Sequence, residues 1–308
     1  MKTVFLFSGQ GSQYPGMGAE LAEKSSAAKQ ILECGSDIMG FDLAKKLSDS
    51  TPEELAQTRL SQPAIFTTSM LALAAARENG IDNCAAAGHS LGEYAAMYAS
   101  GMLGMEDAFR AIKLRRAAAM AEAAEATGGS MAAIIGSDNE TIAKVCEEVN
   151  GFCAPANYNS PQQTVIAGES AAIDEAVAKF AEMGKRAVKL AVSAAFHTKL
   201  MAGAAEKFKG EIAGFPFKAP NCDFYSNLYG RKLDDFSDMP SYLAAHICSP
   251  VKFVDELTAM QSAGIEAYVE LGPGKVLTGL VKKFDRGANA MHIENAETLE
   301  KALAALKG

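Results

Sequence analysis

The sequence predicts an α/β protein in which helices cover a mainly parallel sheet and a second, smaller unit is inserted. Strand-like and helix-like segments alternate from the start: a buried-strand run at Thr3–Phe7, a helical stretch at Leu21–Met39 and an Ala-rich apolar helix at Pro63–Arg77. This alternation is typical of parallel sheets, because a helix usually forms the crossover between parallel strands. The 308 residues suffice for one large domain with a lesser one attached.

The smaller unit is predicted at residues 128–192. Its segments are expected to form strand, helix, strand, strand, helix and strand, the βαββαβ order of a ferredoxin-like unit. The six segments are Met131–Ile135, Asn139–Val149, Ala154–Tyr158, Thr164–Ala167, Ala171–Met183 and Arg186–Val192. Strand and helix patterns resume afterwards, so residues 1–127 and 193–308 are expected to form the large domain. A cleft between the domains is the expected place for a site.

Composition excludes several classes of function. The chain is 49% hydrophobic and 21% charged, as in well-packed globular proteins. A net charge of -8 without a basic stripe argues against nucleic-acid binding, which depends on clustered Lys and Arg. No window approaches the roughly 20 apolar residues that span a bilayer, so we expect a soluble protein without a membrane partner.

The cysteines predict neither a disulfide framework nor a metal site. They are scattered, with no C-x-x-C and no short-spaced Cys/His cluster, which favours a reducing cytoplasm. The six are Cys34, Cys84, Cys146, Cys153, Cys222 and Cys248.

The strongest chemical signal is the G-x-S-x-G segment Gly88–Gly92, centred on Ser90. Small residues at Cys84–Ala87 precede it and a helical stretch at Glu93–Tyr98 follows, which is the strand-turn-helix context of a nucleophile elbow. Flanking glycines allow a sharp turn that exposes the serine oxygen at a helix N-terminus. The pattern alone also fits an ordinary Gly-rich turn, but its context favours a nucleophile and a large domain like that of α/β-hydrolases.

The expected base is His197, one of four histidines. His89 adjoins Ser90 on a sharp turn, where neighbouring side chains diverge, and His292 lies in an apparent late strand. His197 follows the inserted unit, where the chain re-enters the large domain beside the expected cleft. A lone histidine more often has no catalytic role. No acid stands out between Ser90 and His197, so a backbone carbonyl is expected to orient the imidazole, forming a dyad rather than a triad.

Two glycine-rich segments do not predict nucleotide binding. Ser8–Gln13 follows the first strand, but no Lys-Ser or Lys-Thr follows it and Tyr14 replaces the third fingerprint glycine. Its glycines could still bring a backbone N–H close to a ligand. Gly272–Lys275 lacks the Walker A glycine and hydroxyl positions and is predicted to be a turn.

Arg115 shares the apolar stripe of a helix with Ala108, Ile112 and Ala119. An arginine that faces a core or cleft needs an anion. From the pattern alone, a structural acidic partner is favoured over a substrate.

These motifs together resemble the malonyl-CoA:acyl carrier protein transacylase family of fatty-acid synthesis and its polyketide acyltransferase relatives. The resemblance covers nearly the whole chain. It is carried, in order, by GQGSQ (9–13), QPA (62–64), GHSLGE (88–93), NYNSP (157–161), SAAFH (193–197), SPV (249–251) and GPGKVLTGL (272–280).

The resemblance implies a catalytic role for each of five residues. Ser90 is acylated, His197 acts as general base and then acid, and the N–H groups of Gln10 and Leu91 form the oxyanion hole. Arg115 takes the role of binding the malonyl carboxylate with its guanidinium fork, which moves it from a structural residue to a specificity residue.

Further positions follow from the same resemblance. The main-chain carbonyl that orients the histidine falls on His246, where Gln is common in the family. Gln62 and Asn159, in the QPA and NYNSP motifs, are expected to bind substrate. Phe196 favours malonyl over methylmalonyl, and Ser8 stands where the family usually has Pro.

The implied partners are malonyl-CoA and acyl carrier protein, with no cofactor, and relatives generally act as monomers. The carrier proteins are generally acidic, so a basic patch is expected to receive them. Candidate residues are Lys185, Arg186, Lys189, Lys282 and Lys283. Three other functions stay open: a stand-alone acyltransferase of a polyketide synthase, a serine thioester hydrolase, and a non-catalytic module that binds carrier protein.

Overall fold

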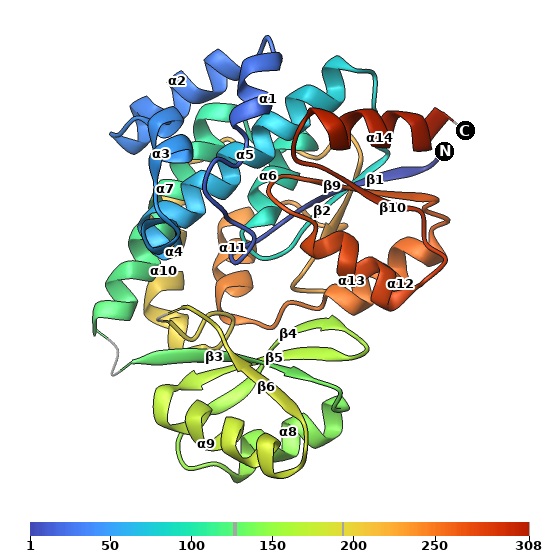
Figure 1. The fold of residues 1–308 in the computed structure, drawn as a ribbon. Coiled ribbons are helices and arrows are strands. Elements are labelled where there is room, and N and C mark those ends of the chain that lie inside the picture. The colour runs from blue at the N-terminus through green and yellow to red at the C-terminus, as the bar shows by residue number, and fades with distance from the viewer. Residues whose placement is uncertain (126–127, 193, 308) are drawn as a thin grey trace.

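The structure is a computed structural model that describes residues 1–125, 128–192 and 194–307. The larger of its two sheets is formed by β1 (Thr3–Phe7), β2 (Ala85–Gly88), β7 (Asp223–Ser226), β8 (Arg231–Lys232), β9 (Ala267–Leu271) and β10 (Ala290–Ile293). The strand order is β10-β9-β1-β2-β7-β8 (Figure 1). All neighbours are parallel except β7 and β8, so the expected α/β fold with a mainly parallel sheet is confirmed.

Helices cover both faces of this sheet. Those before the smaller unit are α1 (Ala19–Lys24), α2 (Ala28–Met39), α3 (Leu43–Asp49), α4 (Pro52–Ala56), α5 (Thr58–Glu78), α6 (Gly92–Ala99) and α7 (Met105–Glu125). Those after it are η1 (Lys199–Met201), α10 (Ala202–Ile212), α11 (Met239–Cys248), α12 (Phe253–Ser262), α13 (Val276–Phe284) and α14 (Ala296–Lys307). Along β1, Phe5 and Phe7 pack in the main core with α5 and α7, whereas Val4 and Leu6 pack with α12 and α13. Alternate side chains thus serve opposite faces, as a parallel sheet with two helical layers requires.

The predicted helix Leu21–Met39 is wrong in its continuity, because α1 ends at Lys24 and α2 begins at Ala28. Glu78, at the end of α5, accepts hydrogen bonds from Ser25 Oγ (3.1 Å), Ser26 Oγ (2.7 Å) and Ala27 N (3.1 Å). An acid from a distant helix therefore stabilises the N-terminus of α2, where backbone N–H groups lack helical partners.

The predicted helix Pro63–Arg77 is too short at its start. The helix α5 begins at Thr58, so Pro63 lies inside it. Proline leaves the carbonyl four residues earlier without its usual donor, and here that carbonyl belongs to Arg59. The Arg116 guanidinium of α7 donates to the Arg59 oxygen at 2.6 Å, which supplies the missing hydrogen bond.

The smaller sheet is antiparallel. It contains β3 (Gly129–Ile135), β4 (Cys153–Ser160), β5 (Gln163–Glu169) and β6 (Arg186–Lys189), with helices α8 (Asn139–Glu148) and α9 (Ser170–Glu182) between strands. The strand order is β4-β5-β3-β6. Figure 1 shows α8 and α9 on the side of this sheet that faces away from the larger unit. The last strand ends before the predicted Val192, and the boundary residues Thr127 and Ser193 lie outside the described residues.

The other face of the smaller sheet joins the main core. Met131, Ala133, Val165 and Ala167 belong to the same apolar cluster as the larger sheet. The strand β4 is also tied to the chain after α11, because Tyr158 N donates to the Val251 oxygen at 2.8 Å and Val251 N donates to the Ala156 oxygen at 2.9 Å. These backbone bonds fix the position of one sheet relative to the other.

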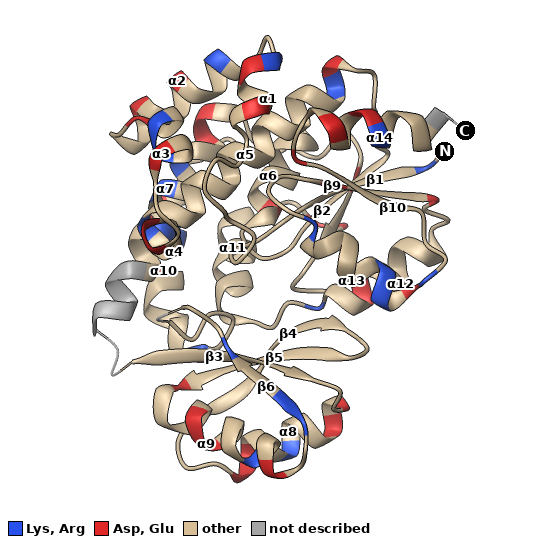
Figure 2. Ribbon diagram, in the orientation of Figure 1, with Lys and Arg blue, Asp and Glu red and all other residues tan. Residues whose placement is uncertain are grey.

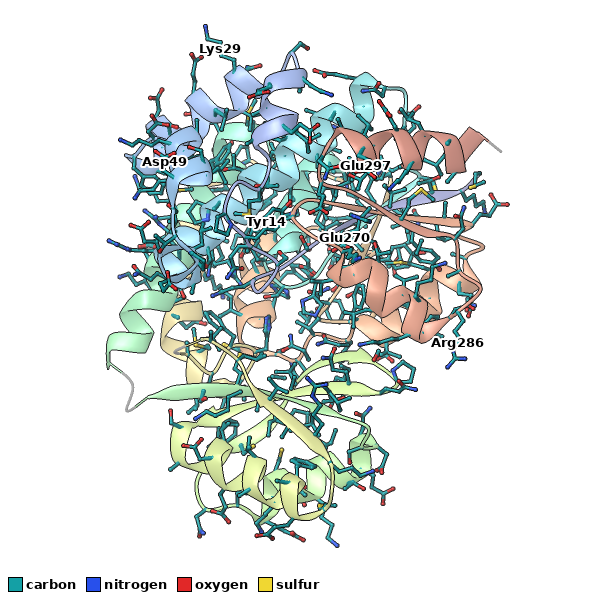
Figure 3. All side chains as sticks on the ribbon, in the orientation of Figure 1. Tyr14, Lys29, Asp49, Glu270, Arg286 and Glu297 are labelled. Carbon is teal, nitrogen blue, oxygen red and sulfur yellow. The ribbon has the colours of Figure 1, made fainter. Side chains whose placement is uncertain are left out.

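A buried carboxylate positions α13 at the edge of the larger sheet. Residues 272–275 form the predicted turn after β9, and Glu270, labelled in Figure 3, lies just before it. Its two oxygens accept hydrogen bonds from Leu277 N (2.9 Å) and Thr278 N (2.7 Å), as an acid at a helix N-terminus does. Among the described residues, no helix combines the length and apolar character that crossing a membrane requires.

Candidate active site

Ser90 lies on the turn between β2 and α6 with a φ of 53°, in the left-handed region. Two glycines make this turn possible. A Cβ atom on Gly92 would lie 1.9 Å from the Phe7 oxygen, and one on Gly88 would lie 2.0 Å from the Gly92 carbonyl carbon. Because neither position can hold a side chain, the G-x-S-x-G spacing follows from the close approach of β1, β2 and α6.

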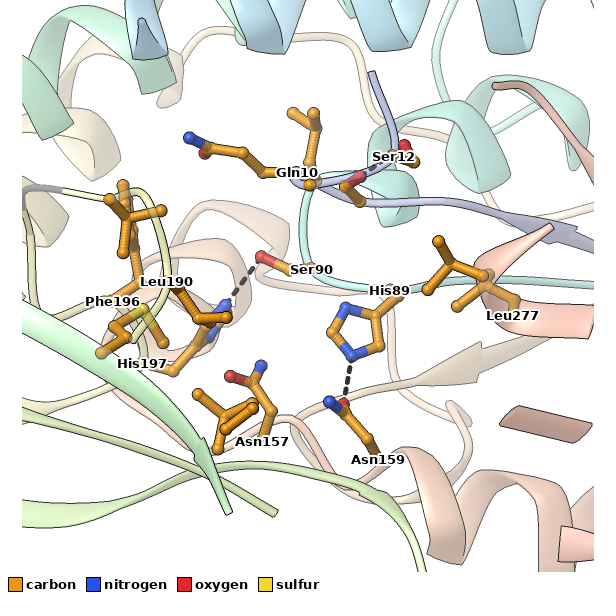
Figure 4. Close-up of a pocket in the computed structure, with 18 of the residues that line it drawn as sticks. Gln10, Ser12, His89, Ser90, Asn157, Asn159, Leu190, Phe196, His197 and Leu277 are labelled. Carbon is orange, nitrogen blue, oxygen red and sulfur yellow. Dashed lines mark hydrogen bonds between the residues drawn. The ribbon is translucent and has the colours of Figure 1, made fainter. Parts of the chain in front are cut away.

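His197 meets Ser90 in the cavity, with its Nε2 atom 2.7 Å from Ser90 Oγ (Figure 4). The other ring nitrogen, Nδ1, lies 3.0 Å from the His246 oxygen and 3.1 Å from the Ser249 oxygen. Carbonyl oxygens only accept hydrogen bonds, so Nδ1 carries the hydrogen and the lone pair of Nε2 faces the serine. The structure thus places the His246 carbonyl where the resemblance implied, together with a Ser249 carbonyl that the sequence did not reveal.

The end of α11 supplies these acceptors. The helix ends at Cys248, and the last carbonyls of a helix have no partner within it. His197 N also donates to the Ile247 oxygen at 3.0 Å, which holds the histidine backbone against the same helix end. The negative end of the helix dipole therefore faces an imidazole that gains positive charge when it accepts a proton.

His197 is neutral at physiological pH. Burial, followed by the positive charge of Arg115 and the neighbouring His89, lowers the pKa of His197 to about 3. The two carbonyl hydrogen bonds oppose this shift. A neutral, oriented imidazole is ready to accept the serine proton.

Gln10 and Leu91 border the cavity beside Ser90. Among the described residues, neither backbone N–H has a hydrogen-bond acceptor. The loop that carries Gln10 approaches the nucleophile turn closely, since a Cβ on Gly9 would lie 2.5 Å from the His89 oxygen. Two unpaired N–H groups beside a nucleophile are suited to stabilise an oxyanion.

Arg115 is buried beside the nucleophile, with 3% of its surface exposed and its Nη2 atom 3.2 Å from Ser90 Oγ. Its guanidinium lies over the rings of Tyr94 and Phe196, and its Nε has no hydrogen-bond partner. Burial lowers the pKa of Arg115. In the described part of the chain, no carboxylate lies within ion-pair distance of the guanidinium. The buried Glu93 interacts with Arg115 at longer range, but burial raises the pKa of Glu93 to about 8, so this carboxyl is mostly protonated at neutral pH and is not a full counter-ion. A buried cation without a counter-ion is costly, and a bound anion would remove that cost.

The cavity has a volume of about 220 Å³ and is lined by both units. The larger unit and the segment after β6 contribute Gly9, Gln10, Gly11, Ser12, His89, Ser90, Leu91, Arg115, Leu190, Val192, Phe196, His197, Val276, Leu277 and Leu280. The smaller sheet contributes Met131, Ala133, Asn157, Asn159, Gln163 and Val165.

The two expected substrate-binding amides differ in placement. Asn159 lines the cavity, and its Oδ1 lies 2.7 Å from His89 Nε2, so His89 points toward the smaller sheet rather than toward the serine (Figure 4). Gln62 is fully buried in α5 and is not among the residues that line the cavity. Neither its amide oxygen nor its amide nitrogen has a hydrogen-bond partner.

Sequence reasoning missed several polar groups at the site. Asn157 lies in the NYNSP segment but carries no separate sequence signal, and Gln163 lies outside every motif; both residues line the cavity. Asn227 also lies outside every motif, although its side chain accepts a hydrogen bond from Ser90 N at 2.6 Å. That contact spans 137 residues, a separation over which sequence pattern carries no information.

Comparison with known proteins shows extensive similarity. A family model described as "Acyl transferase domain" matches residues 4–302. The Bacillus subtilis protein named malonyl CoA-acyl carrier protein transacylase is 38% identical, over 99% of this chain and 98% of that protein. The crystal structure of the Clostridium perfringens protein of the same name is 34% identical with a TM-score of 0.93, covering 100% of this chain and 98% of that one. A malonyl-transacylase solved with a type II polyketide synthase acyl-carrier protein is also 34% identical, with a TM-score of 0.93 and 99% of each chain covered.

Proposed function

The chain belongs to the acyl transferase family and, within it, to the malonyl-CoA:acyl carrier protein transacylases, and from this premise we propose that Ser90 carries the malonyl group between the two substrates. The enzyme moves malonyl from malonyl-CoA to the phosphopantetheine thiol of acyl carrier protein in fatty-acid synthesis. One observation supports the assignment of roles above all others: the 2.7 Å contact between Ser90 and His197 lies beside Arg115, a buried cation without a counter-ion.

The first half-reaction acylates Ser90. His197 Nε2 removes the proton from Oγ as the oxygen attacks the thioester carbonyl, and the N–H groups of Gln10 and Leu91 receive the developing oxyanion. When the tetrahedral intermediate collapses, the C–S bond breaks and His197 returns the proton to the leaving CoA sulfur. The carbonyls of His246 and Ser249 stabilise the imidazolium between these two steps.

The second half-reaction runs the same chemistry in reverse. The carrier-protein thiol gives its proton to His197 and attacks the malonyl ester, and Ser90 Oγ leaves with that proton. The apolar residues Leu190, Val192 and Phe196 line the cavity and favour a thiol on a long arm over bulk water.

Arg115 is proposed to select the malonyl group. In the structure its Nη2 atom contacts Ser90 Oγ, and a malonyl carboxylate would replace this contact with a two-pronged pair. Phe196, whose ring packs against the guanidinium, limits its movement. Gln62 and Asn159 are proposed to support substrate binding, Asn159 from the cavity wall and Gln62 from within α5.

We also propose the domain arrangement that the sequence predicted. Residues 1–127 and 193–308 would form a large hydrolase-like domain and residues 128–192 a ferredoxin-like insertion. The βαββαβ element order and the strand order β4-β5-β3-β6 support the second part. The mostly parallel sheet with a serine turn after β2 supports the first.

Carrier protein is proposed to approach between β6 and α13. Leu190, just after β6, and Leu277 of α13 both line the cavity. Figure 2 shows basic residues on β6 and beside α12 and α13. Of the candidates, Lys185 precedes β6, Arg186 and Lys189 lie on β6, and Lys282 and Lys283 lie on α13; their positive charges suit an acidic partner despite the overall charge of -8. We expect the enzyme to work as a cytoplasmic monomer.

Transfer and hydrolysis are separated by measuring CoA release with and without phosphopantetheinylated acyl carrier protein. The proposed function predicts one rapid equivalent of CoA per enzyme without carrier protein, and continuous release with formation of malonyl-carrier protein when it is added. Continuous CoA release without the carrier would instead indicate a thioester hydrolase. Carrier proteins from fatty-acid and polyketide systems, compared in parallel, test the pathway.

A further inference from the structure

The buried side chain of Asn227 forms hydrogen bonds with two backbone groups at the turn that carries Ser90. Its Oδ1 accepts the hydrogen bond from Ser90 N at 2.6 Å, and its Nδ2 donates to the Gly88 oxygen at 2.6 Å. The positive φ of Ser90 turns its N–H away from the strand ladder, so without Asn227 that buried donor would lack a partner. One amide therefore satisfies both backbone groups of the strained turn.

The Asn227 amide oxygen also contacts His246, whose backbone carbonyl orients His197. His246 Nε2 lies 3.3 Å from Asn227 Oδ1, and the His246 carbonyl accepts from His197 Nδ1. Since an amide oxygen only accepts, His246 Nε2 carries the hydrogen. These hydrogen bonds link four residues in a closed ring. Asn227 Oδ1 contacts Ser90 N and His246 Nε2. The His246 carbonyl contacts His197 Nδ1, and His197 Nε2 contacts Ser90 Oγ.

Neighbouring groups fix the orientation of the Asn227 amide. Its Nδ2 also donates to Glu256 Oε1 at 2.6 Å, and its backbone N donates to Glu93 Oε1 at 2.6 Å. Glu93 in turn accepts from the Tyr242 hydroxyl. Because Ser90 N can only donate and the Gly88 oxygen can only accept, a flipped amide would lose both of these hydrogen bonds. The oxygen must therefore face Ser90 and His246.

We propose that Asn227 is a positioning residue for acylation, which holds the Ser90 turn and the carbonyl that orients His197 in one fixed relation. Asn227 is fully buried and is not among the residues that line the cavity, so it acts through Ser90 and His246 rather than on the substrate. The inference rests on the proposed acylation of Ser90. It adds a residue, more than a hundred positions from the nucleophile, that no motif for the reaction contained.

The test is a single-turnover measurement of CoA release over a range of malonyl-CoA concentrations. Asn227→Ala is expected to lower the limiting acylation rate roughly 10²-fold, as small misplacements of reacting groups do, with the half-saturating concentration unchanged. Asn221→Ala is the matched control, because Asn221 is an exposed asparagine that precedes β7. A folded Asn227→Ala enzyme with the wild-type limiting rate, or with a loss confined to half-saturation, would overturn the proposal.

A second pair of variants serves if Asn227→Ala does not fold. Asn227→Asp keeps an oxygen for Ser90 N but sets another against the Gly88 oxygen, which can only accept, so acylation should slow. Adding Glu256→Gln sets an amide donor, which does not titrate, against the new carboxyl and should recover about tenfold in rate, a typical coupling between touching groups. A double variant no faster than Asn227→Asp alone would contradict the proposal. Failure of the wild-type enzyme to release one equivalent of CoA would instead refute the proposed function.

Discussion

Ser90 and His197 are the two non-glycine residues with positive φ in the part of the chain that the structure describes, at 53° and 63°. Their side chains meet at 2.7 Å across 107 residues of sequence. Non-glycine residues in this region are strained and persist only where their surroundings hold them. Here the glycines around Ser90, Asn227 beneath it and the end of α11 behind His197 provide that support.

The close approach of Gly92 to β1 predicts that Gly92→Ala cannot keep the nucleophile turn. The added Cβ would lie 1.9 Å from the Phe7 oxygen, and the required backbone shift should cost about 1–3 kcal/mol of stability together with most of the activity. Thermal unfolding and acylation rate measure the two effects. Gly210→Ala is the matched control: Gly210 lies in α10 with nothing within 4 Å of an added Cβ, and a gain of about 0.5 kcal/mol is expected. Equal behaviour of the two variants would contradict the steric explanation.

Arg115 predicts a change in acyl selectivity. Arg115→Ala should lower kcat/KM for malonyl-CoA roughly 10²- to 10³-fold, because charge-assisted hydrogen bonds to the carboxylate disappear, and should affect acetyl-CoA far less. Arg115→Lys should recover only part of the loss, since an ammonium lacks the fork. Arg116→Ala provides a control from the next position of α7, where the guanidinium bonds to the Arg59 oxygen instead, and should leave the malonyl-to-acetyl ratio unchanged. Equal losses for both substrates in Arg115→Ala would return Arg115 to a structural role.

The environment of His197 predicts an unusual pH profile. Burial and Arg115 lower its pKa to about 3, so the base stays neutral as pH falls, and the acid limb of kcat/KM for malonyl-CoA should lie well below 6.5. A bound malonyl carboxylate offsets the charge of Arg115, so the acid limb of kcat should lie above that of kcat/KM. Initial rates of CoA release as a function of pH measure both limbs. An acid limb of kcat/KM near 6.5 would show that the imidazole is not desolvated as the structure indicates.

Much of the fold could be predicted from sequence because it depends on local patterns. The run Thr3–Phe7 and the six segments of the smaller unit were found because strand and helix periodicities differ within a few residues. The break between α1 and α2 was missed because its cause, the carboxylate of Glu78, lies about fifty residues away in sequence. The continuation of α5 through Pro63 was missed for the same kind of reason, since the compensating donor comes from Arg116.

The residues of the candidate site also fall into those that local sequence predicts and those that it does not. Ser90 could be predicted because the flanking glycines form a recognisable motif, and His197 could be predicted because the sequence has only four histidines. The burial of Gln62 within α5, the Ser249 carbonyl and the Asn227 bridge depend on how distant segments pack. A hydrogen-bond acceptor that is buried next to a turn produces no pattern in the local sequence. Only the three-dimensional structure identifies such a residue.

The most direct test of the account is the intact mass of the enzyme after brief exposure to malonyl-CoA without carrier protein. Wild-type protein should gain one malonyl group, located by peptide mapping on Ser90, and holo-acyl carrier protein should remove it. Ser90→Ala should gain none while keeping the wild-type fold by circular dichroism. An equal malonyl adduct on Ser90→Ala, or an adduct mapped to another residue, would contradict the central claim that this serine carries the acyl group.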